Sequence, residues 1–237
     1  MKIQLFGSEA ESLRPLMDRY TNLEVVEDDP ETVVCFGGDG TLLAAEMQLP
    51  HVPKVPIRNS RRGIRCITDP PEEVIARLAS GDLVRREHLK LECSVTHAEN
   101  GRPDTVLLAI NEFSVHMGRA NSSVRFNIWL DGKQYGEASD KEFIGDGFIV
   151  STPFGSTAYF NKITRGIFWA GIGVAFMYAN QHTNHMIVSE ATCIEAEITR
   201  GPAILAHDNS TTYIDLAEGD RLSVVRSESP AVLLMME

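Results

Sequence analysis

A glycine-rich turn near the start of the sequence, Gly37-Gly38-Asp39-Gly40-Thr41, holds the residues with the clearest chemical meaning. It follows a short apolar run, Thr32 to Phe36, and precedes a helix-like stretch, Thr41 to Gln48. A glycine turn between a buried strand and a helix exposes backbone N–H groups to an anion such as phosphate. Asp39 is unusual there, because its carboxylate repels phosphate. It suits either of two tasks, accepting a proton from an attacking hydroxyl or holding a metal ion. A plain Asp-Gly turn is the simpler alternative.

A polar pair, Asn111-Glu112, follows the strand-like run from Thr105 to Ile110. Amide and carboxylate side chains at the end of a strand can bind the hydroxyl groups of a sugar. A polar turn with no ligand is the alternative interpretation of this pair.

A longer segment, Asp146 to Tyr159, combines an acidic glycine turn, a strand and a hydroxyl-rich loop, Ser151 to Thr157. Hydroxyl and free N–H groups suit phosphate and ribose, and Tyr159 suits packing on a base or ribose face. The alternative is a loop that caps a helix, with Ser156 or Thr157 as the N-cap.

The bulk composition limits the class of protein. The 237 residues are 43% hydrophobic and 23% charged, as in globular proteins of one or two domains. A net charge of -11 argues against general nucleic-acid binding and against an anionic membrane surface as the binding partner.

The four cysteines are scattered, and the longest apolar stretch, Ile167 to Ala179, is too short to span a bilayer. We therefore expect a cytoplasmic protein with reduced thiols. His182 and His185 have a spacing that could bind a metal, but loop histidines are common, so no metal ligands are predicted.

The first third of the chain alternates strand and helix patterns, which favours a parallel sheet flanked by helices. The expected strands are Ile3 to Phe6, Thr32 to Phe36 and Val55 to Ile57. The expected helices are Ala10 to Tyr20, Thr41 to Gln48, and Pro71 to Leu78 with Asp69 as its cap.

After about Glu87 the pattern becomes strand-rich. Val124, Phe126, Ile128 and Leu130 alternate with other residues, and Asp131-Gly132 then indicates a hairpin turn. One helix is expected between Ile163 and Ala179. Its aromatic residues are interpreted as a packed helix face or a subunit interface, and they are Phe168, Trp169, Phe176 and Tyr178.

Two common nucleotide motifs are absent from the sequence. There is no G-x-x-x-x-G-K-[ST] and no G-x-G-x-x-G. In contrast, the three motifs above resemble the NAD kinase family, which has a GGDG turn, an Asn-Glu pair and a D-G-x-x-x-S-T-P-x-G-[ST]-T-A-Y segment in this order. His207-Asp208-Asn209 is a weaker match to a D-G-Q-like turn of that family. The resemblance covers most of the chain.

The resemblance implies a Rossmann-like α/β domain, residues 1–88, and a β-rich, sandwich-like, NAD-binding domain, residues 89–237. It also implies transfer of a phosphoryl group from ATP or polyphosphate to the 2′-hydroxyl of the adenosine ribose of NAD, with Mg²⁺ or another divalent cation as cofactor. A homodimer or homotetramer is implied as well.

The same resemblance assigns roles to particular residues. Asp39 would accept the hydroxyl proton, since phosphoryl transfer relies mainly on positioning and charge neutralisation. Phosphate or ATP would be held by Gly37, Gly38, Gly40 and Thr41. NAD would be bound by Asp39, Gly40, Asn111, Glu112, Asp146, Thr157, Ala158, Tyr159 and Asn209.

The sequence departs from the family in one loop. Where the family has G-x-N-x-G-x-L-G-F-L, this chain has Arg58 to Ile67, which contains four arginines. These arginines suit a solvated loop and a phosphate clamp equally. Two other functions stay open: a non-catalytic NAD(P)-binding sensor, which the altered loop favours, and a lipid or diacylglycerol-type kinase that shares the GGDGT turn.

Overall fold

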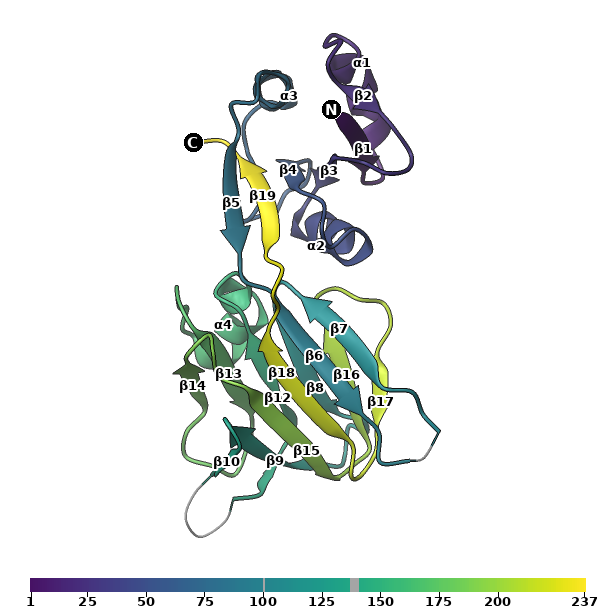
Figure 1. The fold of residues 1–237 in the computed structure, drawn as a ribbon. Helices are drawn as coiled ribbons and strands as arrows, with labels where there is room; N and C mark the ends of the chain where they lie inside the picture. The colour runs from purple at the N-terminus through teal and green to yellow at the C-terminus, as the bar shows by residue number, and fades with distance from the viewer. Residues whose placement is uncertain (100, 137–140) are drawn as a thin grey trace. The chain divides into compact units, whose positions relative to one another are not determined.

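The computed structural model describes residues 1–99, 101–136 and 141–237, which form two compact units (Figure 1). The first unit is Met1–His88 with Ser229–Glu237, and the second is Leu89–Glu228. Residues 229–237 were expected in the second domain. They belong to the first unit because strand β19 (Ala231–Met235) pairs with β4 (Lys54–Arg58) and β5 (Val84–His88).

The first unit is built on a six-stranded sheet in the order β2-β1-β3-β4-β19-β5. Strands β2, β1, β3 and β4 are parallel to their neighbours, and only β5 runs antiparallel. The expected α/β fold with a parallel sheet is therefore confirmed. Strand β1 comprises Lys2–Phe6, β2 Glu24–Val25 and β3 Thr32–Gly37.

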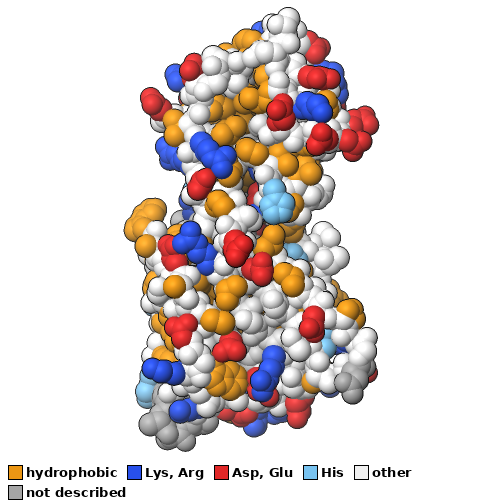
Figure 2. Space-filling model, viewed as in Figure 1, with side chains coloured by type: hydrophobic (Ala, Val, Ile, Leu, Met, Phe, Trp, Pro, Cys, Tyr) orange, Lys and Arg blue, Asp and Glu red, His pale blue; other side chains and the backbone are white. Residues whose placement is uncertain are grey.

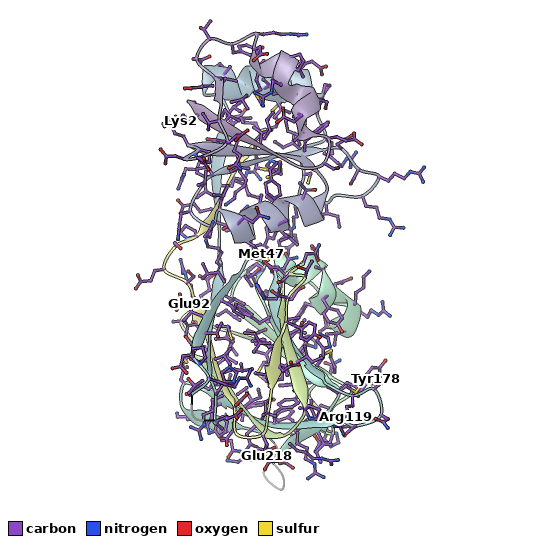
Figure 3. The ribbon with its side chains drawn as sticks, turned by 90° about the vertical axis from the view of Figure 1, so that its right-hand side faces the viewer. Lys2, Met47, Glu92, Arg119, Tyr178 and Glu218 are labelled. Carbon is purple, nitrogen blue, oxygen red and sulfur yellow. The ribbon has the colours of Figure 1, made fainter. Side chains whose placement is uncertain are left out.

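Three α-helices accompany this sheet. Helix α2 (Asp39–Gln48) packs against β3 and β4, and Met47, which Figure 3 labels, lies near its C-terminal end. Helices α1 (Arg14–Met17) and α3 (Pro71–Ser80) contribute to one hydrophobic core with the sheet. A buried ion pair between Lys54 and Glu46 joins β4 to α2.

Two details of the helices differ from the sequence expectation. The segment from Ala10 begins as a 3₁₀ turn, because Pro15 lacks the N–H that an α-helix starting at Ala10 would need. Helix α1 is short and ends at Met17. Helix α3 has Pro70 rather than Asp69 at its N-cap, with no side-chain cap. Its end at Gly81 is left-handed, as expected for a glycine stop.

The second unit is a sandwich of two antiparallel sheets, which confirms the expected β-rich fold (Figure 1). The first sheet contains β10 (Lys133–Tyr135), β9 (Val124–Leu130), β15 (Ile194–Arg200), β18 (Arg221–Arg226), β6 (Leu91–Thr96) and β7 (Thr105–Ala109), with β11 (Phe143–Gly145) beside β9. The second contains β14 (His185–Val188), β13 (Ile172–Met177), β12 (Gly147–Ser151), β8 (Glu112–Met117), β16 (Ala203–His207) and β17 (Ile214–Leu216).

The core of the sandwich lies between the inner faces of these sheets. Phe126 and Ile128 of β9 join Phe148 and Val150 of β12 in one buried cluster. The alternation predicted for β9 is therefore the alternation of a sheet with one buried face. The turn after β9 has positive φ at Asp131 and Gly132, as a two-residue hairpin requires.

The prediction of a helix between Ile163 and Ala179 is wrong. Helix α4 (Tyr159–Thr164) ends near the start of that range, and β13 (Ile172–Met177) occupies most of the remainder. Every residue of β13 is buried, and a strand buried on both faces has the same continuous apolar run as a buried helix. Phe176 belongs to the sandwich core, whereas Trp169 is 81% and Tyr178 is 92% exposed. The aromatic residues therefore do not form one helix face.

Helix α4 covers the outer face of the second sheet, where Phe160 and Phe168 pack on Ile149, Ala175 and Met177. On the face shown in Figure 2, acidic and basic side chains are interspersed rather than separated by sign. Within residues 1–99, 101–136 and 141–237, no helix is long and apolar enough to cross a membrane.

Candidate active site

Asp39 stands at the junction between β3 and α2, as the first residue of the helix. Its Oδ2 accepts a hydrogen bond from the backbone N–H of Ile64 (3.0 Å), and its Oδ1 accepts one from the N–H of Arg65 (2.9 Å). The thiol of Cys66 lies 3.5 Å from Oδ1. The carboxylate is therefore held by the loop of residues 58–67, which we call the arginine loop.

The arginine loop is fixed at its base and against the glycine turn. Arg58 donates its backbone N–H to Ile67 O (2.9 Å), and Asn59 donates its own to Gly37 O (2.7 Å). A Cβ on Gly38 would lie 2.8 Å from Ser60 Oγ and 3.0 Å from Arg62 O. A side chain at position 38 would therefore require Ser60 to rotate and the Arg62 carbonyl to shift slightly.

Cys66 of the arginine loop is buried. Burial, with a smaller effect from the charge of Asp39, raises the pKa of its thiol to about 12. The thiol is therefore neutral at ordinary pH and acts as a weak donor toward the carboxylate.

In the second unit, antiparallel pairing brings three polar segments to one end of a sheet. Ser151 at the end of β12 pairs with Glu112 at the start of β8, and His207 at the end of β16 pairs with Phe113. The segments that follow or precede these residues are Ser151 to Thr157, Asn111-Glu112 and His207 to Asn209. The first and third of these segments contain Thr157 and Asn209, and Ala158 follows Thr157 at the start of α4.

Asp208 joins two of these segments. Its carboxylate accepts the backbone N–H groups of Ile110 (2.9 Å), Asn111 (2.8 Å) and Glu112 (3.2 Å). Its own N–H donates to Glu112 O (3.1 Å). Asp208 also has φ of 43°, a left-handed conformation that Asp tolerates better than most residues.

The hydroxyl-rich loop joins the same cluster through Thr152. The N–H of Thr152 donates to Asn111 O (2.8 Å), and its hydroxyl donates to Ile110 O and accepts the N–H of Gly155. A Cβ on Gly155 would overlap the backbone of Asn111. The loop is therefore packed directly on the Asn111-Glu112 turn.

The capping alternative for this loop is wrong. Ala158 occupies the N-cap position of α4, and no side chain caps the helix there. The hydroxyl of Ser156 instead lies within hydrogen-bond distance of two carbonyl oxygens, of Pro153 (2.8 Å) and Phe168 (3.1 Å), and can donate to either.

Glu112 is a buried carboxyl group of the cluster with a shifted pKa. Its side chain is buried, and its Oε2 has no hydrogen-bond partner among the described residues. Burial, with a smaller effect from the charge of Asp208, raises the pKa of Glu112 to about 8. Glu112 is therefore largely protonated at neutral pH, so it can donate a hydrogen bond to a ligand as well as accept one.

Asp146 and Tyr159 line a pocket of about 800 Å³ on the second unit. The ring of Tyr159 stacks on His116 at a centroid distance of 5.8 Å, and its hydroxyl lies 3.3 Å from Met177 Sδ. Burial raises the pKa of Tyr159, and the charges of Glu112 and Asp146 raise it further. Tyr178 also lines the pocket, and Figure 3 shows it at the edge of the unit.

The site residues of the second unit form two groups along β12. Asp146 precedes the strand and donates its N–H to Met177 O (2.8 Å), whereas Ser151 ends it beside Glu112. Five residues of strand separate the two positions by about 17 Å. An extended ligand, rather than a single small group, would be needed to contact both ends.

Comparison with known proteins decides the family. Residues 110–236 match the family model of the ATP-NAD kinase C-terminal domain, which is more than half of the chain. The chain belongs to the NAD kinase family of enzymes.

Several NAD kinases are similar in sequence. That of Marinobacter nauticus is 35% identical over 135 residues, which are 54% of this chain and 43% of that protein. That of Neisseria meningitidis is 27% identical over 218 residues, 86% of this chain and 69% of that protein. That of Thiobacillus denitrificans is 28% identical over 225 residues, 90% of this chain and 74% of that protein.

Two solved structures share the fold. Yeast NADH kinase complexed with NADH has a TM-score of 0.80 at 19% identity, covering 91% of this chain and 67% of that one. An NAD kinase from Archaeoglobus fulgidus in complex with ATP has a TM-score of 0.75 at 21% identity. That match covers 98% of this chain and 92% of that one. At these identities the likeness establishes the NAD kinase fold alone.

Two residues of this candidate site lie outside the set of site residues predicted from the sequence. Asp208 organises the Asn111-Glu112 turn, although the sequence analysis selected its neighbour Asn209. His116 stacks under Tyr159 from the adjacent strand. The Asp208-Asn209 pair between two strands could have indicated Asp208 from the sequence. The second residue has no local signal, because His116 on β8 meets Tyr159 only through the packing of α4 on the second sheet.

Replacing Glu112 with glutamine should change how stability depends on pH. Because the folded pKa lies above the unfolded one, wild-type stability falls as the pH rises from about 4.5 to about 8. Glutamine mimics the protonated form, so the variant should gain stability relative to the wild type over this range, on the order of a few kcal/mol. Urea unfolding at pH 5 and pH 8 measures the difference.

The matched control for that experiment is Glu218→Gln, which changes an exposed glutamate of the same unit, labelled in Figure 3. It should change stability by less than about 0.5 kcal/mol at either pH. A Glu112→Gln effect of equal size at both pH values would show that Glu112 is ionised throughout.

Proposed function

We propose that this member of the NAD kinase family transfers a phosphoryl group from ATP or polyphosphate to the 2′-hydroxyl of the adenosine ribose of NAD, producing NADP. The observation that carries the proposal is the arrangement of Asp39, whose carboxylate is fixed at a glycine turn by two backbone N–H groups. The convergence of the Asn111-Glu112 turn with the hydroxyl-rich loop supports the nucleotide acceptor.

Asp39 is the proposed general base. A carboxylate offers about four lone-pair positions. Two N–H groups and the Cys66 thiol occupy three of them, which leaves one for the hydroxyl of the acceptor. As that hydroxyl oxygen bonds to the transferred phosphorus, its proton passes to Asp39, and the bond to the leaving phosphate breaks. The anchored carboxylate loses no side-chain freedom when the substrate binds.

The phosphate groups of the donor are assigned to the glycine turn. Gly37, Gly38, Gly40 and Thr41 surround the start of α2, where backbone N–H groups and the helix dipole favour an anion. Thr41 lies beside Gly37, since a Cβ on Gly37 would be 2.9 Å from Thr41 Cβ. Its hydroxyl is therefore part of the same turn.

A divalent cation would be held here mainly by the phosphate groups of the donor, which are usual ligands of Mg²⁺. The lone pairs of Asp39 are taken by the Ile64 and Arg65 N–H groups, the Cys66 thiol and the acceptor hydroxyl, so Asp39 would contribute only nearby negative charge. When bound, Mg²⁺ would neutralise phosphate charge. Among the described residues there is no group of three or more His, Cys, Asp or Glu side chains placed to hold a metal.

NAD is assigned to the second unit. Asn111, Glu112 and Asn209 would bind ribose hydroxyls or adenine edges, with the protonated Glu112 as a donor. Thr157 and Ala158 would line the same part of the site. Asp146 and Tyr159, in the pocket of about 800 Å³, would take the nicotinamide and its ribose. The two separated groups suit a dinucleotide, which is long enough to reach both.

The deciding experiment incubates the purified protein with NAD, Mg²⁺ and either ATP or polyphosphate. NADP is detected with an NADP-specific dehydrogenase. NADP formation with either donor is the expected result. NAD binding without NADP would instead favour the non-catalytic sensor, for which the altered arginine loop is the supporting feature.

We also propose that the protein is a cytoplasmic homodimer or homotetramer. The exposed Trp169 and Tyr178 are large apolar side chains suited to an interface. The four cysteines are free thiols, as is usual in a reducing compartment. Light scattering coupled to size exclusion would measure the number of subunits.

A further inference from the structure

We propose that the arginine loop binds the phosphate chain of the phosphoryl donor through Arg58, Arg61 and Arg62. The ligand chemistry is a linear chain of phosphates, supplied either by a nucleoside triphosphate or by inorganic polyphosphate. The inference extends the proposed kinase function, and its binding test is independent of that function.

The first supporting observation is the concentration of positive charge in an acidic chain. The net charge is -11, yet four arginines lie between residues 58 and 65. Arg58, Arg61 and Arg62 are exposed. Within the described ranges, none of these three has a carboxylate at salt-bridge distance, although exposed arginines elsewhere, such as Arg14 and Arg226, do. Their guanidinium groups are therefore available to an anion from solution.

The second observation is the position of the loop beside the proposed base. The Cβ position of Gly63 lies 3.4 Å from Arg58 Cδ and 3.5 Å from Asp39 Oδ1, so Arg58 and Asp39 flank the same glycine. Arg65 is half-buried, and burial lowers its pKa while the Asp39 charge raises it. Arg58 and Arg65 thus lie beside Asp39, and the exposed Arg61 and Arg62 belong to the same loop.

The third observation is that the loop is held in place. The Ile57–Ile67 bridge closes its base, and Ile67 donates its N–H to Pro56 O (2.7 Å). The bonds from Asn59 to Gly37 and from Ile64 and Arg65 to Asp39 hold its two sides. A fixed backbone reduces the entropy that the arginine side chains lose on binding.

Guanidinium groups are well suited to this ligand. Each presents a planar set of N–H donors that can bind two phosphate oxygens, and it stays charged at all ordinary pH values. Three such groups can neutralise most of the charge on a triphosphate. Asp39 faces the same turn, so the arginines would also offset its repulsion of the donor.

The binding test uses inorganic tripolyphosphate as the probe and isothermal titration calorimetry as the measurement. The main variant is the double substitution Arg61→Ala and Arg62→Ala, which removes two exposed side chains and keeps the backbone. We expect its dissociation constant for tripolyphosphate to rise at least tenfold. The control is Arg19→Ala, an exposed arginine of the same unit, which should change the constant less than twofold.

The kinetic test measures KM for ATP and for polyphosphate in separate assays. The double variant should raise the KM for the donor at least tenfold and leave the KM for NAD within twofold. An effect on ATP alone identifies the nucleoside triphosphate as the bound source, and an effect on polyphosphate alone identifies the inorganic chain. Lysine at both positions should restore part of the affinity, because charge is kept and the fork geometry is lost.

Two results would overturn the inference: no tripolyphosphate binding by the folded wild type, or equal binding by the double variant. Loss of tripolyphosphate binding in the variant, together with a wild type that makes no NADP, would contradict the kinase proposal and retain the phosphate clamp. Thermal unfolding of each variant checks that the loop substitutions leave the fold intact.

Discussion

Asp39→Asn is expected to lower the rate of NADP formation by roughly 10³-fold, within the range that a general base contributes. Asparagine has nearly the same shape but cannot accept the proton of the 2′-hydroxyl. The dissociation constant for NAD should change less than about threefold, because the lost interaction acts mainly in the transition state. Single-turnover kinetics and calorimetry measure the two quantities separately.

The asparagine side chain also alters the contacts that hold the arginine loop. Its oxygen can accept one of the N–H groups of Ile64 and Arg65, while its NH₂ group must face the other. Thermal unfolding therefore accompanies the kinetics, with Asp18→Asn as the control at an exposed aspartate of the same unit. Equal losses in NAD affinity and in rate would show that Asp39 is only a loop anchor.

Asp208→Ala is expected to destabilise the second unit by about 2–4 kcal/mol, since backbone N–H groups left without an acceptor cost about 1–3 kcal/mol each when buried. The carboxylate holds the N–H groups of three consecutive residues, 110 to 112. We also expect the KM for NAD to rise at least tenfold, because the Asn111-Glu112 turn loses its anchor. Urea unfolding and the assay for NADP measure these effects.

The control for that substitution is Asp215→Ala, which changes an exposed aspartate on the neighbouring strand β17. It should alter stability by less than about 0.5 kcal/mol. Hydrogen exchange at residues 110 to 112 provides a local readout, since these amides should exchange faster in Asp208→Ala alone. Unchanged exchange there would contradict the anchoring role.

Much of the fold follows from local sequence patterns. The alternation in β9 and the Asp131-Gly132 turn predict a hairpin because both depend on neighbouring residues only. Strand β5 was missed, because its sequence, VRREH, is mostly charged and lies at the edge of its sheet. An edge strand has one free side and needs no apolar alternation.

The candidate site also has a part that the sequence predicts and a part that only the structure shows. The glycine turn and the Asp146 to Tyr159 segment are contiguous in sequence, so their residue types alone indicate a phosphate and nucleotide site. The partners of these residues come from distant segments. Asp208 is 97 residues from Asn111, and Arg65 is 26 residues from Asp39.

The sequence by itself determined the α/β and β-rich halves, the family, and the residues most suited to chemistry. Those features depend on residue type, spacing and local periodicity. Only the tertiary structure decided that β13 is a strand, that β19 returns to the first unit, and that the arginine loop holds Asp39. It also decided the raised pKa of Glu112. Each of these depends on burial and pairing between residues far apart in the chain, which local patterns do not encode.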